Sequence, residues 1–236
     1  KLKTSNQKLP DDLISALKKA TLSNELDINK LPPTAINYID LILSCLQVEP
    51  DIVSIVLPHS GPKQTYWSHL ATCMKHNTTL RTLVTSDKLE SSVKILCESI
   101  SSNKDSKLKN FAFIETEITE KQLSYLFKLL TATSAESLFF DKSMNYETLN
   151  KFITSSTFSM IFQKLKSFTL KGIIGVQIKA IFETLKHVTK LAFINCNLNV
   201  DEVIQEIQKV YCVSLSVIGG LCSGKFNTST VLNPTL

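Results

Sequence analysis

A short apolar pattern that recurs along most of the chain constrains its fold more than any other feature. The clearest copy is residues 188–198 (VTKLAFINCNL), with apolar residues at positions one, four and six, Cys at nine and Leu at eleven. In a strand, successive side chains point to opposite faces, so Leu191 and Phe193 share one face and Ala192 lies on the other. A single strand cannot bury such a face alone, which predicts further copies stacked beside it.

Eight copies of the pattern align on the apolar residue at the fourth position. These anchor residues are Leu26, Ile55, Leu83, Phe111, Leu138, Phe168, Leu191 and Leu215. Their spacings are 29, 28, 28, 27, 30, 23 and 24 residues, and the sixth position is clearly apolar in every copy except Thr85. Repeat periods of roughly 20–29 residues are typical of leucine-rich repeats, in which each unit holds one strand and one helix or 3₁₀ turn.

Over about residues 22–221 the chain resembles the ribonuclease-inhibitor type of leucine-rich repeat. This resemblance implies an α/β fold: a right-handed leucine-rich-repeat solenoid, or horseshoe, with parallel strands on the concave side and helices on the convex side. The chain departs from the family at the ninth position, where Thr116, Ser143, Ile173 and Gly220 replace the usual Cys or Asn. The expected organisation is a capping helix at 1–21, a repeat array at 22–222 and an irregular tail at 223–236.

Helix signals occur between the strand copies. Asp11 and Asp12 begin a short amphipathic stretch that predicts a helix over the end of the array, and Pro33 predicts the start of the next helix. Thr119, with Gln122 three residues later, is typical of a helix start. Further helices are expected at about residues 90–101 and 146–153, and the insertion 154–162 contains a second apolar patch.

Composition indicates a protein without a membrane span. Hydrophobic residues make up 43% of the 236 residues, enough for a continuous core, but no apolar run reaches the roughly 18 residues of a membrane helix. The polar start lacks a secretion signal and an initiator Met, so we expect a processed or excised piece of a longer protein. Six Cys without paired spacing indicate buried free thiols in a reducing compartment, and therefore a cytoplasmic protein.

The basic charge does not predict nucleic-acid binding. The net charge of +5 comes from Lys residues and a single arginine, Arg81. Nucleic-acid readers usually depend on Arg for bidentate base contacts, and the Lys residues here are interspersed with Glu and Asp as on a solvated surface. We therefore expect no nucleic-acid partner and no membrane insertion, and the oligomeric state stays open.

Two motifs could carry chemistry, and both have simpler explanations. Residues 219–225 match the spacing of a phosphate-binding loop, but Phe226 stands where the motif needs a metal-binding Ser or Thr. His69, Cys73 and His76 share one helical face, as metal ligands can, but three ligands from one helix rarely complete a tetrahedral site. No nucleophile with a readable base is present. We expect no enzyme activity, no metal and no cofactor.

The predicted function is therefore non-enzymatic protein–protein interaction, because solenoids of this kind present an extended concave surface. The alternative is a regulatory domain of a small-GTPase or actin-cytoskeleton control protein. Ran-GTPase-activating proteins and CARMIL-type regulators have arrays that resemble this one, although no diagnostic motif of either occurs here. In the first of these families Arg81 could serve as a catalytic finger, and otherwise it is an ordinary surface arginine.

The concave face supplies the candidate binding residues. Its fifth strand positions are Asp27, Val56, Val84, Ala112, Phe139, Thr169, Ala192 and Ser216. The four consecutive apolar residues that end in Phe139 indicate a partner site, since exposed contiguous apolar area often marks one. A basic rim is expected at Arg81, Lys109, Lys166, Lys171 and Lys190, which suits an acidic, partly apolar protein segment. Alternatively, Phe139 turns into the array, or the tail or the N-terminal helix covers it.

Overall fold

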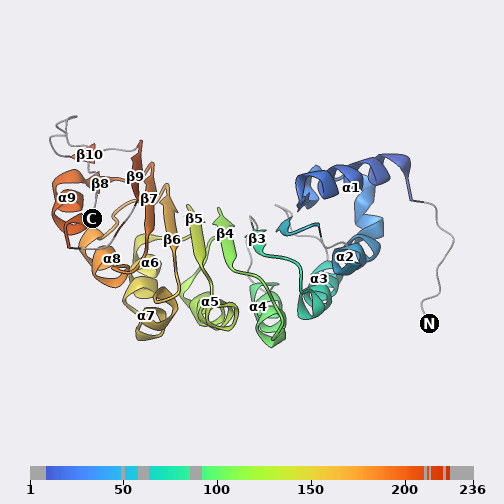
Figure 1. Cartoon of the computed structure of the whole chain (residues 1–236), viewed down its shortest axis with the longest axis horizontal. Coiled ribbons are helices and arrows are strands. Elements are labelled where there is room, and N and C mark those ends of the chain that lie inside the picture. Colours follow the sequence, from blue (N-terminus) through green and yellow to red (C-terminus); the bar gives the residue numbers. More distant parts are fainter. Residues whose placement is uncertain are drawn as a thin grey trace.

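A computed structural model describes residues 9–48, 51–57, 64–85, 92–209, 212, 214–219 and 222–223. Within them the chain forms an open parallel sheet of eight strands flanked by helices (Figure 1). The strands are β1 (Glu25–Asp27), β2 (Ser54–Val56), β3 (Thr82–Thr85), β4 (Asn110–Ile114), β5 (Ser137–Asp141), β6 (Ser167–Lys171), β7 (Lys190–Ile194) and β9 (Ser214–Ile218). A second, two-stranded sheet pairs β8 (Leu198–Asn199) with β10 (Cys222–Ser223).

Helices connect the strands and follow one another along the array. They are α1 (Asp11–Ser23), α2 (Ile39–Val48), α3 (Gln64–His76), α4 (Ser92–Ser102), α5 (Glu120–Thr133), α6 (Tyr146–Thr154), α7 (Ser156–Phe162), α8 (Ile178–Thr184) and α9 (Val200–Ile207), with short 3₁₀ helices η1 (Ile28–Lys30) and η2 (Pro33–Tyr38). In Figure 1, α1 lies at one end of the molecule and α9 at the other, and α3, α4, α5 and α7 lie below the strands. The described helices include none with the length and apolarity of a membrane span.

The sheet register confirms the alignment of the eight anchors. Each strand pairs in parallel with the next, in the order β1-β2-β3-β4-β5-β6-β7-β9. The paired row of anchors runs through Leu26, Ile55, Leu83, Phe111, Leu138, Phe168, Leu191 and Leu215 without a slip. The sequence spacing therefore predicted both the order and the register of the sheet.

The anchors and their sixth-position partners form the core between sheet and helices. From β1 to β7 every anchor is buried, and only Leu215 in β9 is partly exposed. Phe140 shows the packing at its densest: its ring stacks on Phe113 at a centroid distance of 5.3 Å and meets Phe152 and Phe168 edge-on at 5.5 and 6.1 Å. Such offset and edge-on pairs stabilise beyond the area that they bury.

Side chains at the ninth position form hydrogen bonds between neighbouring repeats, both at Cys196 and where Thr116 and Ser143 replace the usual Cys or Asn. The Thr116 hydroxyl donates to the backbone carbonyl of Thr85 at 3.1 Å, and the Ser143 hydroxyl donates to that of Phe113. The Cys196 thiol reaches the carbonyl of Leu170 at 3.5 Å. Each of these contacts satisfies a buried carbonyl of the preceding repeat, which otherwise would cost free energy.

The predicted helices are present, with small shifts. The backbone N–H of Thr119 donates to the Gln122 side chain at 2.8 Å, as a capping box requires. At Pro33 the chain begins a 3₁₀ helix, and the α-helix starts only at Ile39. The insertion 154–162 contains α7. Of the predicted tail, Ser223 lies in β10, and residues 224–236 fall outside the described part of the chain.

Candidate protein-binding face

The structure places the predicted apolar strip on one continuous outward row of the sheet. In the register, Val56 pairs with Val84, Val84 with Ala112 and Ala112 with Phe139. All four side chains are partly exposed, whereas the anchors on the same strands are buried. These four residues, called the apolar strip below, therefore form a shared surface on the face opposite the core.

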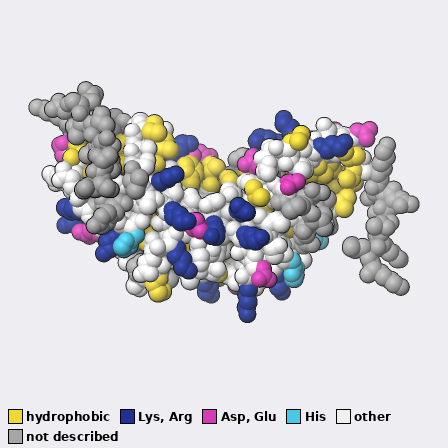
Figure 2. Space-filling view, in the orientation of Figure 1, with side chains coloured by type: hydrophobic (Ala, Val, Ile, Leu, Met, Phe, Trp, Pro, Cys, Tyr) yellow, Lys and Arg dark blue, Asp and Glu magenta, His cyan; other side chains and the backbone are white. Residues whose placement is uncertain are grey.

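Phe139 is the largest side chain of the apolar strip and points away from the core. Its chain neighbours Leu138 and Phe140 are both 0% exposed, so strand alternation turns Phe139 to the other face. The residues beside it in the register, Ala112 and Thr169, are smaller, and Phe139 itself is partly exposed. Figure 2 shows hydrophobic side chains in the hollow at the upper middle of the molecule.

The apolar surface extends to two residues that the sequence reading missed. At the seventh position the register runs through Ile114, Asp141, Lys171 and Ile194, and both isoleucines are partly exposed. The same strand alternation that identified Phe139 could have found them, because Ile114 is two residues beyond Ala112. Together with the apolar strip they make a wider apolar floor across β2 to β7, interrupted between Ile114 and Ile194 by Asp141 and Lys171.

Lys171, which was predicted for the basic rim, lies in this row and forms an ion pair with Asp141. Its Nζ lies 2.7 Å from Oδ2 of Asp141, whose side chain is 9% exposed. The other carboxylate oxygen of Asp141 has no hydrogen-bond partner within the described residues. The pair places one neutral ionic contact between Ile114 and Ile194.

Glu136, which the sequence reading also missed, neutralises part of the expected basic rim. Its carboxylate accepts a hydrogen bond from Lys166 at 2.7 Å and a second one from Lys109. These two hydrogen bonds lower the pKa of Glu136 from 4.5 to about 2, so the group stays ionised at physiological pH. Two of the predicted cations thus share one carboxylate.

Arg81 and Lys190 complete the row of charges where the strands begin. Both are exposed, and neither forms an ion pair within the described part of the chain. Backbone hydrogen bonds from Lys109 to Arg81 at 3.0 Å, and from Lys190 to Lys166 at 2.9 Å, place these residues on neighbouring strands. The row therefore holds four cations and Glu136, with a net charge of +3.

Two sequence motifs were weighed as possible ligand sites, the His69–Cys73–His76 set and residues 219–225, and the second lies mostly outside the described residues. Cys73 is buried, where its thiol contacts the carbonyl oxygen of Leu43 at 3.3 Å, while His69 and His76 are exposed. Among the described residues no group of three His, Cys, Asp or Glu side chains could hold a metal ion. Within 219–225, the pair Cys222–Ser223 forms β10, and residues 220–221 and 224–225 are outside the described ranges.

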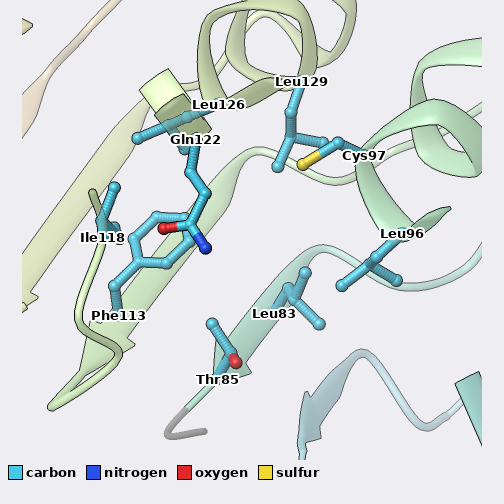
Figure 3. A pocket seen from close by; sticks show the side chains of 9 residues that line it. All are labelled: Leu83, Thr85, Leu96, Cys97, Phe113, Ile118, Gln122, Leu126 and Leu129. Carbon is cyan, nitrogen blue, oxygen red and sulfur yellow. The ribbon is translucent and has the colours of Figure 1, made fainter. Parts of the chain in front are cut away.

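One interior cavity lies between β3, β4, α4 and α5 (Figure 3). It is lined by Leu83, Thr85, Leu96, Cys97, Phe113, Ile118, Gln122, Leu126 and Leu129. Its volume of about 20 Å³ has room for a single water molecule and excludes any larger ligand. Burial raises the pKa of the Cys97 thiol to about 12, which makes this thiol a poor nucleophile.

Comparison with known proteins assigns no family to this arrangement. No protein-family model matches the chain, and no curated protein matches it. The resemblance to leucine-rich repeats therefore depends on the repeat spacing, the sheet register and the ninth-position hydrogen bonds.

Proposed function

We propose that the chain is a leucine-rich-repeat solenoid of the ribonuclease-inhibitor type, with a right-handed course and the apolar strip on its concave side. Three observations support this proposal: repeat spacings of 23–30 residues, eight parallel strands in chain order and one row of anchors in register. Hydrogen bonds from Thr116, Ser143 and Cys196 to the preceding repeat occur where the family usually has Cys or Asn.

The function proposed for this solenoid is non-enzymatic binding of a cytoplasmic protein partner on the concave face. The partly exposed ring of Phe139 among small neighbours is the observation that carries this proposal. Aromatic side chains on such floors supply a large apolar contact at small entropic cost, and they dominate the binding energy of many interfaces. Ile114 and Ile194 would enlarge the same contact.

Charge around the floor favours an acidic segment as the ligand. The row of charged residues where the strands begin (Arg81, Lys109, Glu136, Lys166 and Lys190) has a net charge of +3. The ion pair of Lys171 and Asp141 adds no net charge. A partner segment with an apolar residue over Phe139 and carboxylates towards Arg81 and Lys190 would match both features. Complementary charge of this kind mainly raises the association rate and selects among partners.

Affinity capture from the native cell, with wild type and Phe139→Ala as baits, tests the proposal. The captured partner is then titrated against both proteins and against Lys121→Ala, an exposed change on α5. We expect Phe139→Ala to weaken binding by about 2 kcal/mol, roughly 30-fold in Kd, and Lys121→Ala to leave it unchanged. Equal affinity for wild type and Phe139→Ala would contradict the proposal.

The regulatory alternative has its own assay. If the captured partner is a small GTPase, its hydrolysis rate is measured with wild type and with Arg81→Ala. Acceleration that is lost in Arg81→Ala would support a catalytic finger, because such an arginine is worth a factor of about 10³–10⁵. Binding without acceleration would leave the domain as a non-enzymatic binding module.

A further inference from the structure

The connections that lead from helices into strands carry an unusual concentration of positive charge. Because the strands are parallel and in register, the connections 77–81, 103–109, 134–136, 163–166 and 185–190 enter along one side of the array, called the basic side. Its basic residues are Arg81, Lys104, Lys107, Lys109, Lys164, Lys166, Lys186 and Lys190, and its acidic residues are Asp105 and Glu136. This net charge of +6 exceeds the +5 of the whole chain, so the remainder carries −1.

The opposite side of the array has no comparable charge. The connections that leave β4, β5, β6 and β7 (residues 115–119, 142–145, 172–177 and 195–197) contain Glu115, Glu117 and Lys142 as their only charged residues. Their net charge is −1, against +6 on the basic side. Between β3 and β7, the excess of positive over negative charge in the connections is therefore concentrated on one side of the array.

Neither helix stabilisation nor ion pairing accounts for the basic side. Cations stabilise a helix when they lie in its last turn, and none of the eight cations of the basic side lies there. The last turn of α3 has its own basic residues, Lys75 and His76, and the last turns of α4, α5, α7 and α8 contain none. Lys109 and Lys166 share Glu136, and Lys164 donates to the Ser134 hydroxyl at 3.0 Å. The remaining cations form no ion pair within the described residues: Arg81, Lys104, Lys107, Lys186 and Lys190.

The basic side is broad and exposed, and its apolar side chains are buried. Its eight cations are all exposed, and from Arg81 to Lys190 it covers β3 to β7, four strand spacings or about 19 Å. Figure 2, a view down the shortest axis and so onto a broad side of the molecule, shows Lys and Arg side chains gathered over its middle. The apolar residues of these connections point inward and are buried: Leu80, Leu108, Ala135, Leu165, Leu185 and Val188.

We propose that the basic side docks the protein on an anionic phospholipid surface. Seven of its eight cations are lysines, whose compact charge needs no particular acceptor geometry and suits a fluid layer of headgroups. Each Lys near such a surface contributes about 1 kcal/mol, which is screened by salt. The basic side contains no Phe, Tyr or Trp on which unpaired bases could stack, which disfavours single-stranded nucleic acid. Docking in this way uses Arg81 and Lys190, which the protein-binding proposal assigns to carboxylates of the partner, and it leaves the outward row of Phe139 uncovered by lipid.

Sedimentation with lipid vesicles tests the proposal, using phosphatidylcholine with about 30% phosphatidylserine at about 0.15 M salt. Lys107→Glu with Lys186→Glu removes charge from the basic side. Lys18→Glu with Lys19→Glu, two exposed positions on α1, changes the net charge equally elsewhere. We expect the first variant to bind at least about tenfold more weakly and the second to bind within about twofold of wild type. Glu136→Gln, which releases two lysines, should bind more tightly than wild type.

Several results would overturn the proposal. They are no binding to the anionic vesicles, equal binding to pure phosphatidylcholine, and equal loss in the two double variants. Binding that survives about 1 M salt would also exclude an electrostatic surface of this kind. Retention of duplex DNA at the same salt without retention of vesicles would assign the basic side to nucleic acid instead. Phe139→Ala should sediment like wild type, so failure here is distinguishable from failure of the protein-binding proposal.

Discussion

Two adjacent phenylalanines on β5 should respond in opposite ways to the same substitution. Phe139 faces outward and is partly exposed, whereas Phe140 is 0% exposed at the centre of the aromatic cluster. The changes Phe139→Ala and Phe140→Ala remove the same atoms from neighbouring positions of one strand. Any difference in stability therefore reports which face of the sheet each ring occupies.

The magnitudes follow from the surroundings of each ring. Phe140→Ala removes a stacked contact with Phe113 at 5.3 Å and edge contacts with Phe152 and Phe168, and it leaves a cavity. Buried Phe→Ala changes cost about 3–5 kcal/mol in free energy of unfolding. Phe139→Ala removes a ring that is partly exposed on the outward face, for which we expect a smaller loss of about 1 kcal/mol.

Urea denaturation followed by circular dichroism measures both costs against wild type. We expect the free energy of unfolding to fall at least about 2 kcal/mol further for Phe140→Ala than for Phe139→Ala, with similar slopes. Equal losses, or the larger loss at Phe139, would place Phe139 in the core. The proposal that a protein partner binds over Phe139 would then be wrong.

Three further outcomes follow from particular contacts. Burial raises the pKa of the Cys73 thiol to about 11 and that of the Cys97 thiol to about 12. Both thiols should therefore resist iodoacetamide at about pH 8 until urea unfolds the chain. Rapid labelling of either thiol in the native protein, mapped by mass spectrometry, would contradict its burial. The buried Asn77 side chain accepts from Leu80 N at 2.8 Å and donates to the Leu46 carbonyl at 2.8 Å, so Asn77→Ala should cost about 2 kcal/mol of unfolding free energy, while the exposed change Thr78→Ala stays within about 0.5 kcal/mol. The pKa of Glu136 is lowered from 4.5 to about 2, so the stability that its ion pairs contribute is present above about pH 4.5 and is lost as the pH falls towards 2. At low salt, the difference in unfolding free energy between wild type and Glu136→Gln should therefore narrow from about pH 4.5 to about pH 2. A constant difference would refute the pairing of Glu136 with Lys109 and Lys166.

The sheet was predictable because two periodicities agree along the chain. Alternation within each copy assigns Leu138 and Phe140 to one face and Phe139 to the other, and the repeat spacing places the copies side by side. The register carries that assignment from β1 to β9 without a slip. Local pattern and global architecture were thus consistent, which is the condition under which sequence reasoning succeeds.

The charge pairing was not predictable in the same way. Glu136 meets Lys109 and Lys166 across 27 and 30 residues, and only the three-dimensional register brings the three onto adjacent strands. The pairing of Lys171 with Asp141 is likewise a contact across 30 residues. Counting cations along the sequence therefore overestimated the unpaired positive charge around the outward face of the sheet and missed the carboxylates there.

The ninth position shows a limit of motif matching. A strict search for Cys or Asn rejects Thr116 and Ser143, yet their hydroxyls donate to backbone carbonyls of the preceding repeat. The physical requirement is a short side chain with a donor that reaches a buried carbonyl, and several residue types meet it. A pattern written in terms of donors would have accepted both residues.

Site-specific photo-crosslinking tests the central claim, that a protein partner binds over the apolar strip, most directly. A photoreactive residue is placed at Thr169, which pairs with Phe139 in the register, and in a second protein at Lys121 on α5. In lysate of the native cell, we expect a discrete protein adduct at position 169, reduced at least about tenfold when Phe139→Ala is added, and none at position 121. Equal adducts at both positions, or an adduct at 169 that Phe139→Ala leaves unchanged, would contradict binding over this face.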